Sequence, residues 1–257
     1  MLGKRTTLFW LAGFKIQADL SWIIIAVLIT WSLGSGLFPN YVPGLSSPAY
    51  VIMGIIGAAG LFASIIFHEV SHSLVARKYG MPIKEITLWI FGGVAHMEDN
   101  PPNPKAELLM AIAGPASSLF LAGVFILLSR LGDIIAYPSS IHGILWYLGR
   151  INLILGLFNL IPAFPLDGGR ALRALIWRFR DNLIQATRIA STIGSGFAFI
   201  LIGAGFFFLF NGSFIGGIWW ILIGFFLHSA SRGSYNQLLM VEALSGKPVK
   251  DFMKTDV

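Results

Sequence analysis

The sequence predicts an all-α polytopic membrane protein with about six transmembrane helices, a short re-entrant β-hairpin between the second and third, and a fourth helix broken by proline. Composition is the first reason: 56% of the 257 residues are hydrophobic and 12% are charged, which is far more apolar than an average soluble domain. The second reason is that the apolar residues fall into runs of the length that crosses a bilayer, about 20 residues. The third is that turn residues and prolines interrupt this pattern at two places.

The apolar runs give the expected spans directly. Lys4, Arg5 and Lys15 precede the first run, as in a signal peptide, but no small-residue cleavage pattern follows, so we expect this span to be retained. We assign residues 1–240 to a membrane-embedded core and residues 241–257 to a cytoplasmic tail. The expected spans are residues 20–38, 50–77, 107–129, 142–163, 184–210 and 215–240.

The basic residues predict the orientation of the chain. Six spans place both termini on one side, and most Lys and Arg residues fall on that side, which the positive-inside rule makes cytoplasmic. Arg130 and Arg150 are exceptions near the other side. The net charge of +6 is therefore explained by membrane topology, and we expect the lipid bilayer and no nucleic acid as a partner. The chain has no cysteine, which excludes disulfides and thiolate metal sites.

Two interruptions lie inside the apolar pattern. Between the second and third spans, the β-prone residues 86–91 and 94–97 flank Gly92-Gly93, which predicts a short hairpin or re-entrant sheet. Such backbone is tolerated at membrane depth only where protein covers it or a wet cavity adjoins it. In the fourth span, Pro162 and Pro165 must break the helix. Asp167 then stands at the N-cap position of an amphipathic basic helix that reaches residue 180.

A candidate metal site lies in the second span, in the sequence HEVSH. His68 and His72 are four residues apart, so both imidazoles project from one helix face and can bind a single cation. Glu69 is offset by one residue, beside the metal, where it can deprotonate a water without being a ligand. Zinc suits such a site because it accepts imidazole and is redox-inert.

Depth in the membrane connects this pair with Asp167. Ionisable residues inside a membrane are costly and are functional candidates for that reason. His72 precedes Arg77 by five residues and Asp167 precedes Arg170 by three, so both lie about 5–10 Å below the cytoplasmic boundary. Two histidines, an aspartate and a water form the open tetrahedral geometry of a catalytic zinc. The alternative is that these polar side chains only form hydrogen bonds between helices.

At these residues the sequence resembles the site-2 protease family of intramembrane zinc metalloproteases. The resemblance rests on HEVSH, on FNLIPAFPLDGGR (residues 158–170), and on the intervening FGG and AIAGPASS stretches. It implies one Zn²⁺ per chain, held by His68, His72 and Asp167, with Glu69 as the general base. It also implies that Asn159 contacts substrate or a developing oxyanion; the alternative is a hydrogen bond between helices. We interpret Gly114-Pro115 as a close-packing or helix-bending feature.

The resemblance also gives the hairpin a role. Its exposed edge could receive an unwound substrate peptide by strand addition, or it could be a structural plug. His96 could approach the metal or be a polar residue at the membrane surface. The resemblance further implies regulated intramembrane proteolysis of single-span membrane proteins, with membrane-tethered transcription regulators as one class of substrate. The last residues, GKPVKDFMKTDV, resemble the opening of a cystathionine-β-synthase-type regulatory domain, which implies a nucleotide-sensing module that would begin there; the alternative is an ordinary cytosolic tail.

Two other classes of membrane protein use similar residues. A metal-ion or proton-coupled transporter could use His68, Glu69, His72 and Asp167 as a relay, and transporters share the broken helix, but no inverted repeat supports this reading. A membrane di-iron oxygenase needs more than the five histidines present. Glu69 separates the protease from the transporter: a general base can be replaced by Gln with zinc retained and hydrolysis lost, whereas loss of a relay residue should impair transport.

Overall fold

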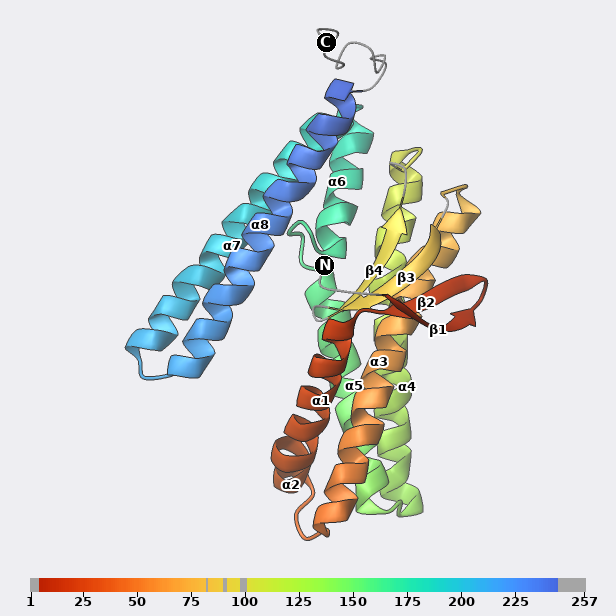
Figure 1. Ribbon diagram of the computed structural model, residues 1–257, viewed down its shortest axis with the longest axis vertical. Helices are drawn as coiled ribbons and strands as arrows, with labels where there is room; N and C mark the ends of the chain where they lie inside the picture. Colours follow the sequence, from red (N-terminus) through yellow and green to blue (C-terminus); the bar gives the residue numbers. More distant parts are fainter. Residues whose placement is uncertain (1–4, 82, 90–91, 98–100, 245–257) are drawn as a thin grey trace, which may run out of the picture. The chain divides into compact units, whose positions relative to one another are not determined.

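The computed structural model describes residues 5–81, 83–89, 92–97 and 101–244. The chain divides into two compact units, Met1–Ile161 and Pro162–Val257, which are described here one at a time. Figure 1 colours the first unit from red to green and the second from green to blue.

The first unit is built on long apolar helices. The first span, Leu20–Tyr41, contains α1 (Leu20–Ser32), a π-helical segment η1 (Leu33–Leu37) and the short α2 (Phe38–Tyr41). It is followed by α3 (Ser47–Lys78), α4 (Pro104–Ile135) and α5 (Ser139–Asn159). At 1.5 Å per residue, the 32 residues of α3 extend for about 48 Å. This helix is therefore longer than the hydrocarbon core of a bilayer, which is about 30 Å thick.

A four-stranded sheet accompanies these helices, in the order β1-β2-β3-β4. Its strands are β1 (Thr6–Leu11), β2 (Phe14–Ala18), β3 (Ile83–Trp89) and β4 (Gly92–Met97). The β1–β2 and β3–β4 pairs are antiparallel, and β2 pairs with β3 in parallel. Ala12 and Gly13 both have positive φ, of 51° and 86°, as the tight two-residue turn of a hairpin requires.

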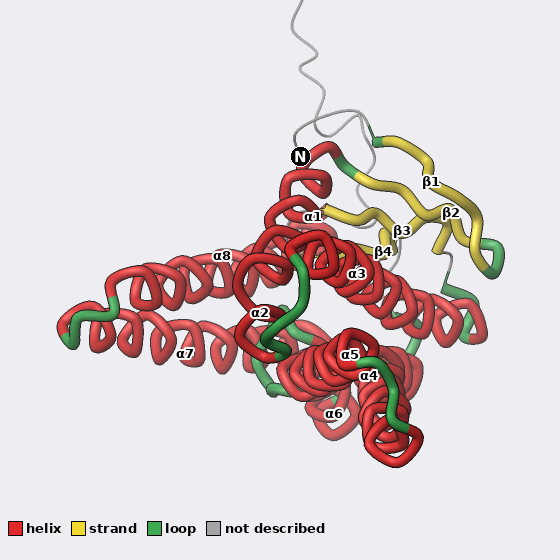
Figure 2. Tube along the Cα trace, turned by 90° about the horizontal axis from the view of Figure 1, so that it is seen from below, coloured by secondary structure: helices red, strands yellow, loops and turns green. Residues whose placement is uncertain are grey.

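The sheet is fixed to α3 and α4 by a common hydrophobic core. Phe14 and Ile16 of β2 are buried with Val70 and Ala76 of α3 and Met110 of α4. At the start of α1, the backbone N–H of Ser21 donates to the Asp19 carboxylate at 2.9 Å and holds the pKa of that carboxyl below its ordinary value. Figure 2 shows the sheet lying along one side of α3.

Small residues let the helices of the first unit approach closely. An added Cβ at Gly60 of α3 would overlap Leu148 of α5, and one at Gly149 of α5 would overlap Ile126 of α4. Such contacts are typical of membrane helices, where van der Waals packing replaces the hydrophobic effect. They hold the three helices α3, α4 and α5 together in the part of the molecule that carries the candidate site.

The second unit begins with the turn at residues 162–166 and contains α6 (Asp167–Arg180), α7 (Leu183–Phe210) and α8 (Phe214–Leu244). The helices α7 and α8 run antiparallel, side by side. The hydroxyl of Ser191 donates to the carbonyl of Ser231 at 2.7 Å, and the hydroxyl of Ser231 donates to the carbonyl of Ser191 at 2.8 Å. This reciprocal pair satisfies both hydroxyls inside an apolar contact.

The predicted fold class is confirmed: the described residues contain six helices long and apolar enough to cross a membrane. The hairpin between the second and third spans is present as β3–β4, but the sequence did not predict its partners β1 and β2. The fourth span ends at Asn159 instead of residue 163, and α6 begins at Asp167, so that Leu166 holds the N-cap position expected for Asp167. The predicted start of a regulatory domain falls largely in residues 245–257, outside the described residues.

Candidate metal centre

His68 and His72 form a buried pair on α3, which we call the imidazole pair. The two side chains are 4% and 6% exposed, and their Nε2 atoms lie 3.1 Å apart. The i, i+4 spacing places both rings on one helix face, with their planes 76° apart. The helix therefore brings together two nitrogen atoms that can bind a metal.

The other nitrogen of each ring is held by α4. His72 Nδ1 lies 2.6 Å from the backbone carbonyl oxygen of Met110. Because a carbonyl can only accept, this Nδ1 carries the proton in a neutral ring and Nε2 presents its lone pair. His68 Nδ1 lies 2.9 Å from the hydroxyl of Ser118, which is fully buried. Hydrogen bonds of this kind fix the orientation of ligating histidines.

Gly114 of α4 faces the imidazole pair. A Cβ added to Gly114 would lie 2.6 Å from His68 Nε2 and would overlap His72 Nε2. The space that a side chain would occupy at residue 114 is thus the space towards which both Nε2 atoms point. The close packing expected for Gly114-Pro115 is present, and Pro115 is accommodated inside the continuous helix α4.

This arrangement fits a zinc ion. Two nitrogens at 2.0–2.1 Å from a tetrahedral zinc lie about 3.4 Å apart, close to the 3.1 Å between the two Nε2 atoms. The tautomer of His72 leaves Nε2 available as a ligand. Both side chains are imidazoles, a nitrogen ligand that zinc accepts readily.

Glu69 follows His68 directly and is half-buried. Consecutive residues of a helix point about 100° apart, so Glu69 cannot share the face of the imidazole pair. The backbone carbonyl of Glu69 accepts a hydrogen bond of 2.8 Å from the Ser73 hydroxyl. Glu69 is therefore adjacent to the imidazole pair on α3, and its side chain is not fully enclosed by the protein.

Asp167 is the first residue of α6 and belongs to the second unit. A carboxylate in the first turn of a helix is stabilised by the positive end of the helix dipole. A Cβ at Gly169 would overlap the backbone of Phe164, so the turn before α6 folds closely against its first residues. The Arg173 guanidinium lies 5.2 Å from the centre of the Phe164 ring and supports the same turn.

Asn159 closes α5 at the end of the first unit. Its Nδ2 donates to the carbonyl of Leu155 at 3.0 Å, one turn earlier in the same helix. An amide nitrogen has two donors, so this bond engages one of them. The side chain is half-buried.

The remaining histidines lie away from the pair or outside the description. His142 Nε2 of α5 is 3.2 Å from Ser129 Oγ and 3.2 Å from Asp133 Oδ1 of α4, so this histidine joins two helices. His228 of α8 packs on Phe199 of α7, with ring centres 4.9 Å apart. His96 belongs to β4, but its side chain lies outside the described part of the chain.

A polar contact that the sequence did not predict lies one turn before the imidazole pair. Asn152 of α5 is fully buried, and its Nδ2 donates to Ser64 Oγ of α3 and to the Leu148 carbonyl, both at 2.9 Å. Ser118 was also missed as a partner of His68, although it lies in the AIAGPASS stretch. For the contact between Asn152 and Ser64, the one available signal in the sequence was an asparagine within an apolar run.

Several known proteins are similar to this chain. Residues 56–137 and 130–203 match the profile of peptidase family M50. Rip3 of Mycobacterium tuberculosis is 37% identical over 95% of this chain, and the match covers 62% of Rip3. Zinc metalloprotease MJ0392 of Methanocaldococcus jannaschii is 37% identical over 76% of this chain and 52% of its own length. The chain thus spans less than two thirds of the length of both relatives.

A solved structure is similar as well. The site-2 protease from Methanocaldococcus jannaschii matches this fold with a TM-score of 0.60 and 34% sequence identity. The match covers 90% of this chain and 94% of that one. At this identity and coverage, the likeness extends over almost the whole membrane core.

Proposed function

We propose that this chain, which belongs to peptidase family M50, the site-2 protease family of zinc metalloproteases, hydrolyses peptide bonds within or near the transmembrane segments of membrane proteins. It is an integral multi-pass membrane protein. The observation that carries the proposal is the imidazole pair, whose Nε2 atoms meet over Gly114 while their Nδ1 atoms are held by α4. Zinc is the metal of this family, and the pair fits it.

The proposed ligand set is His68, His72 and Asp167, with one zinc per chain. Two imidazoles and one carboxylate leave the fourth tetrahedral position open, as in other catalytic zinc sites. Asp167 supplies the oxygen ligand in this proposal because it begins α6 immediately after the proline-broken turn. Its place in FNLIPAFPLDGGR and its expected depth in the membrane support the assignment.

Glu69 is the proposed general base and acid. When bound, zinc supplies a Lewis acid that polarises a carbonyl oxygen and lowers the pKa of water to about 7. The Glu69 carboxylate accepts a proton from the water whose oxygen attacks the carbonyl carbon. Glu69 then donates this proton to the amide nitrogen as the C–N bond breaks, so that an amine leaves and a carboxyl end is formed.

Asn159 is the proposed donor to the substrate or its oxyanion. One N–H of Nδ2 is bound to the Leu155 carbonyl, and the second N–H of the amide remains for a substrate carbonyl. A donor that is already held in place by the protein costs little reorganisation during the reaction. This role is a proposal that rests on the family motif and on the donor count.

The edge of the sheet is the proposed place for the substrate backbone. β4 is the last strand in the sheet order, so in the described part of the chain only β3 pairs with it. A helical peptide must unwind before its carbonyl can be attacked, and an unpaired strand edge offers hydrogen bonds to the extended form. We propose single-span membrane proteins, including tethered transcription regulators, as substrates, and a cytoplasmic location for both termini.

The proposed function is tested by mapping newly formed protein termini in cells that produce the wild-type chain or Glu69→Gln. The wild type should generate termini inside the membrane spans of host proteins, and Glu69→Gln should not, since it keeps the ligands but lacks the base. Zinc content is measured in both preparations to show that the site is loaded. A zinc-loaded wild type that produces no termini beyond the Glu69→Gln background contradicts the proposal.

A further inference from the structure

The second unit contains a basic cavity away from its proposed zinc ligand, at the junction of α6 and α7. Its volume is about 490 Å³, within the range of small-molecule sites. The lining combines two guanidinium groups with an amide, a hydroxyl and two branched aliphatic side chains. These residues are Arg180, Gln185, Arg188, Ile189, Thr192 and Ile193. We propose that this cavity binds the headgroup of an anionic phospholipid.

The turn between the helices brings the two arginines together. Arg180 is the last residue of α6, and Asp181 reverses the chain with a left-handed φ of 48°. Asn182 caps α7 by accepting a hydrogen bond of 2.8 Å from the Gln185 N–H. Arg188 then lies in the second turn of α7, facing the same cavity as Arg180.

The cavity carries net positive charge. Both guanidinium groups are exposed, and within the described part of the chain neither forms an ion pair with a carboxylate. The nearest acidic residue in sequence, Asp181, does not line the cavity. An anion is therefore the complementary ligand, and two guanidinium groups match the paired oxygens of a phosphodiester.

The position of the cavity along α7 favours a lipid over a free anion. From Phe210, the 20 residues that cross a hydrocarbon core of about 30 Å reach back to residue 191. Arg188 and Ile189 thus fall at the level of the headgroups, and Ile193 falls just inside the hydrocarbon. No ionisable residue follows Arg188 in α7.

The side chains that line the cavity change from charged to apolar along α7, as the surroundings change from headgroups to hydrocarbon. The guanidinium groups meet the phosphate, and the Thr192 hydroxyl, which donates to the Arg188 carbonyl at 2.8 Å, keeps its oxygen as an acceptor for a glycerol hydroxyl. Ile193, which is 43% exposed, covers the start of an acyl chain. Basic pockets of this kind between membrane helices recognise anionic headgroups. This inference does not depend on the proposed proteolytic function.

The test is native mass spectrometry of the zinc-loaded, detergent-solubilised protein with equal amounts of dioleoylphosphatidylglycerol and dioleoylphosphatidylcholine. We expect the wild type to bind phosphatidylglycerol preferentially. The double variant Arg180→Gln/Arg188→Gln should bind it about 25-fold more weakly, since each arginine contributes about fivefold, and its binding of phosphatidylcholine should not change. Equal binding of both lipids by the wild type, or unchanged selectivity in the double variant, overturns the proposal.

Two controls keep the result specific. Arg178→Gln and Arg232→Gln remove exposed charges of the same unit outside the cavity and should keep the preference. Inorganic phosphate should form no adduct of comparable abundance; if it does, the site takes a free anion and the lipid assignment is wrong. If the double variant does not fold, Thr192→Glu places a carboxylate in the cavity, and a retained preference for phosphatidylglycerol in that variant contradicts the proposal.

Discussion

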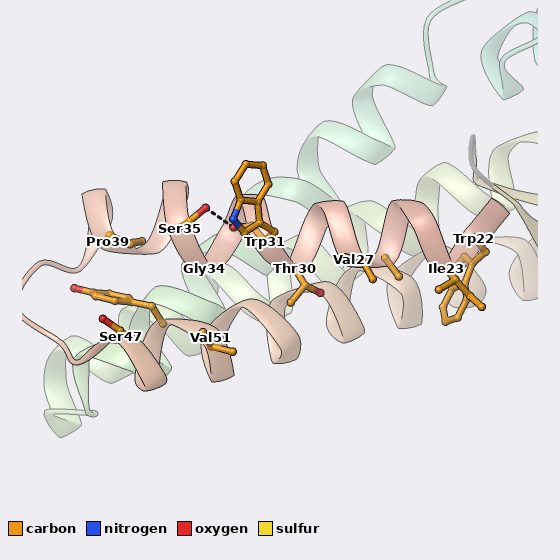
Figure 3. Close-up of a pocket in the computed structure, with 12 residues that line it drawn as sticks. Trp22, Ile23, Val27, Thr30, Trp31, Gly34, Ser35, Pro39, Ser47 and Val51 are labelled. Carbon is orange, nitrogen blue, oxygen red and sulfur yellow. Dashed lines mark hydrogen bonds between the residues drawn. The ribbon is translucent and has the colours of Figure 1, made fainter. Parts of the chain in front are cut away.

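The two halves of α3 have opposite properties. Its second half carries the imidazole pair, where buried nitrogen atoms point to one position and each ring is held by a second hydrogen bond. Its first half lines a groove of about 840 Å³ against the first span, which we call the α1–α3 groove (Figure 3). The groove residues are Trp22, Ile23, Ala26, Val27, Thr30, Trp31, Gly34, Ser35, Pro39, Ser47, Tyr50 and Val51.

The polar groups in the groove do not converge. None of the described residues that line it carries a charge, and two of its hydroxyls bond to backbone carbonyls nearby: Ser35 donates to the Trp31 carbonyl at 2.7 Å and Tyr50 donates to the Val42 carbonyl at 2.7 Å. In Figure 3, Trp22 and Ile23 lie at one end of the groove and Pro39 and Ser47 at the other. The comparison teaches that a large volume does not by itself mark a candidate site on α3, whereas convergent and supported ligand atoms do.

The largest effect should come from Gly114→Ala. Its methyl group would occupy the space over both Nε2 atoms, so we expect zinc affinity to fall by at least about 100-fold, more than the loss of one supporting hydrogen bond causes. Competition with a fluorescent chelator measures this affinity. Gly123→Ala is the matched control, because no heavy atom lies within 4 Å of its added Cβ. Equal zinc affinity in the two variants would show that the pair does not bind metal over Gly114.

Ser118→Ala should have the next largest effect. It removes the hydroxyl that holds His68 Nδ1, and loss of such a partner typically lowers metal affinity about 10–100-fold. The same chelator competition applies, and X-ray absorption would report a more disordered nitrogen shell. Ser117→Ala is the control, since the Ser117 hydroxyl bonds only to the Gly114 carbonyl of its own helix. An affinity equal to that of Ser117→Ala would contradict the role of Ser118.

Asn152→Ala should act on stability and leave metal binding nearly unchanged. The change removes a donor to Ser64 inside the contact of α3 with α5, and we expect a loss of about 1–3 kcal/mol in the free energy of unfolding. Thermal unfolding in detergent, followed by circular dichroism, measures it. Asn211→Ala, which removes an exposed bond to the Phe207 carbonyl, should change stability by less than about 0.5 kcal/mol. The prediction fails if the two variants unfold at the same temperature.

The smallest effect is expected for Ala26→Leu in the α1–α3 groove. The added side chain fills part of the groove, which neither His68 nor His72 lines, so zinc content should not change and stability should shift by less than about 0.5 kcal/mol. Metal analysis and thermal unfolding check both quantities. A loss of zinc in this variant would mean that the groove and the imidazole pair are coupled, and the contrast between the two halves of α3 would be wrong.

The six spans, the broken fourth helix and the family were predicted from the sequence, and all are confirmed. Long apolar runs and the HEVSH spacing are local signals, so they can be recognised without knowing which distant residues they contact in the fold. The helix ends were less accurate: α3 continues to Lys78 and α4 to Ile135, because helices extend past the hydrocarbon core into the headgroup layer.

The sheet shows why features that depend on distant residues were not predicted. β1 and β2 join through Ala12-Gly13, a weaker hairpin signal than Asn-Gly. β2 then pairs in parallel with β3, with Ile16 opposite Ile86, and a partner that distant leaves no local pattern. The support of His68 by Ser118 is equally non-local, since fifty residues separate the two.

The central claim is that the imidazole pair holds zinc and that Asp167 completes the ligand set while Glu69 does not bind the metal. Metal analysis of the purified protein, without chelators, tests it in the wild type, Asp167→Ala and Glu69→Gln. The account predicts about one zinc per chain in the wild type and in Glu69→Gln, and little in Asp167→Ala. A wild type without zinc, or an Asp167→Ala variant that retains zinc fully, would contradict it.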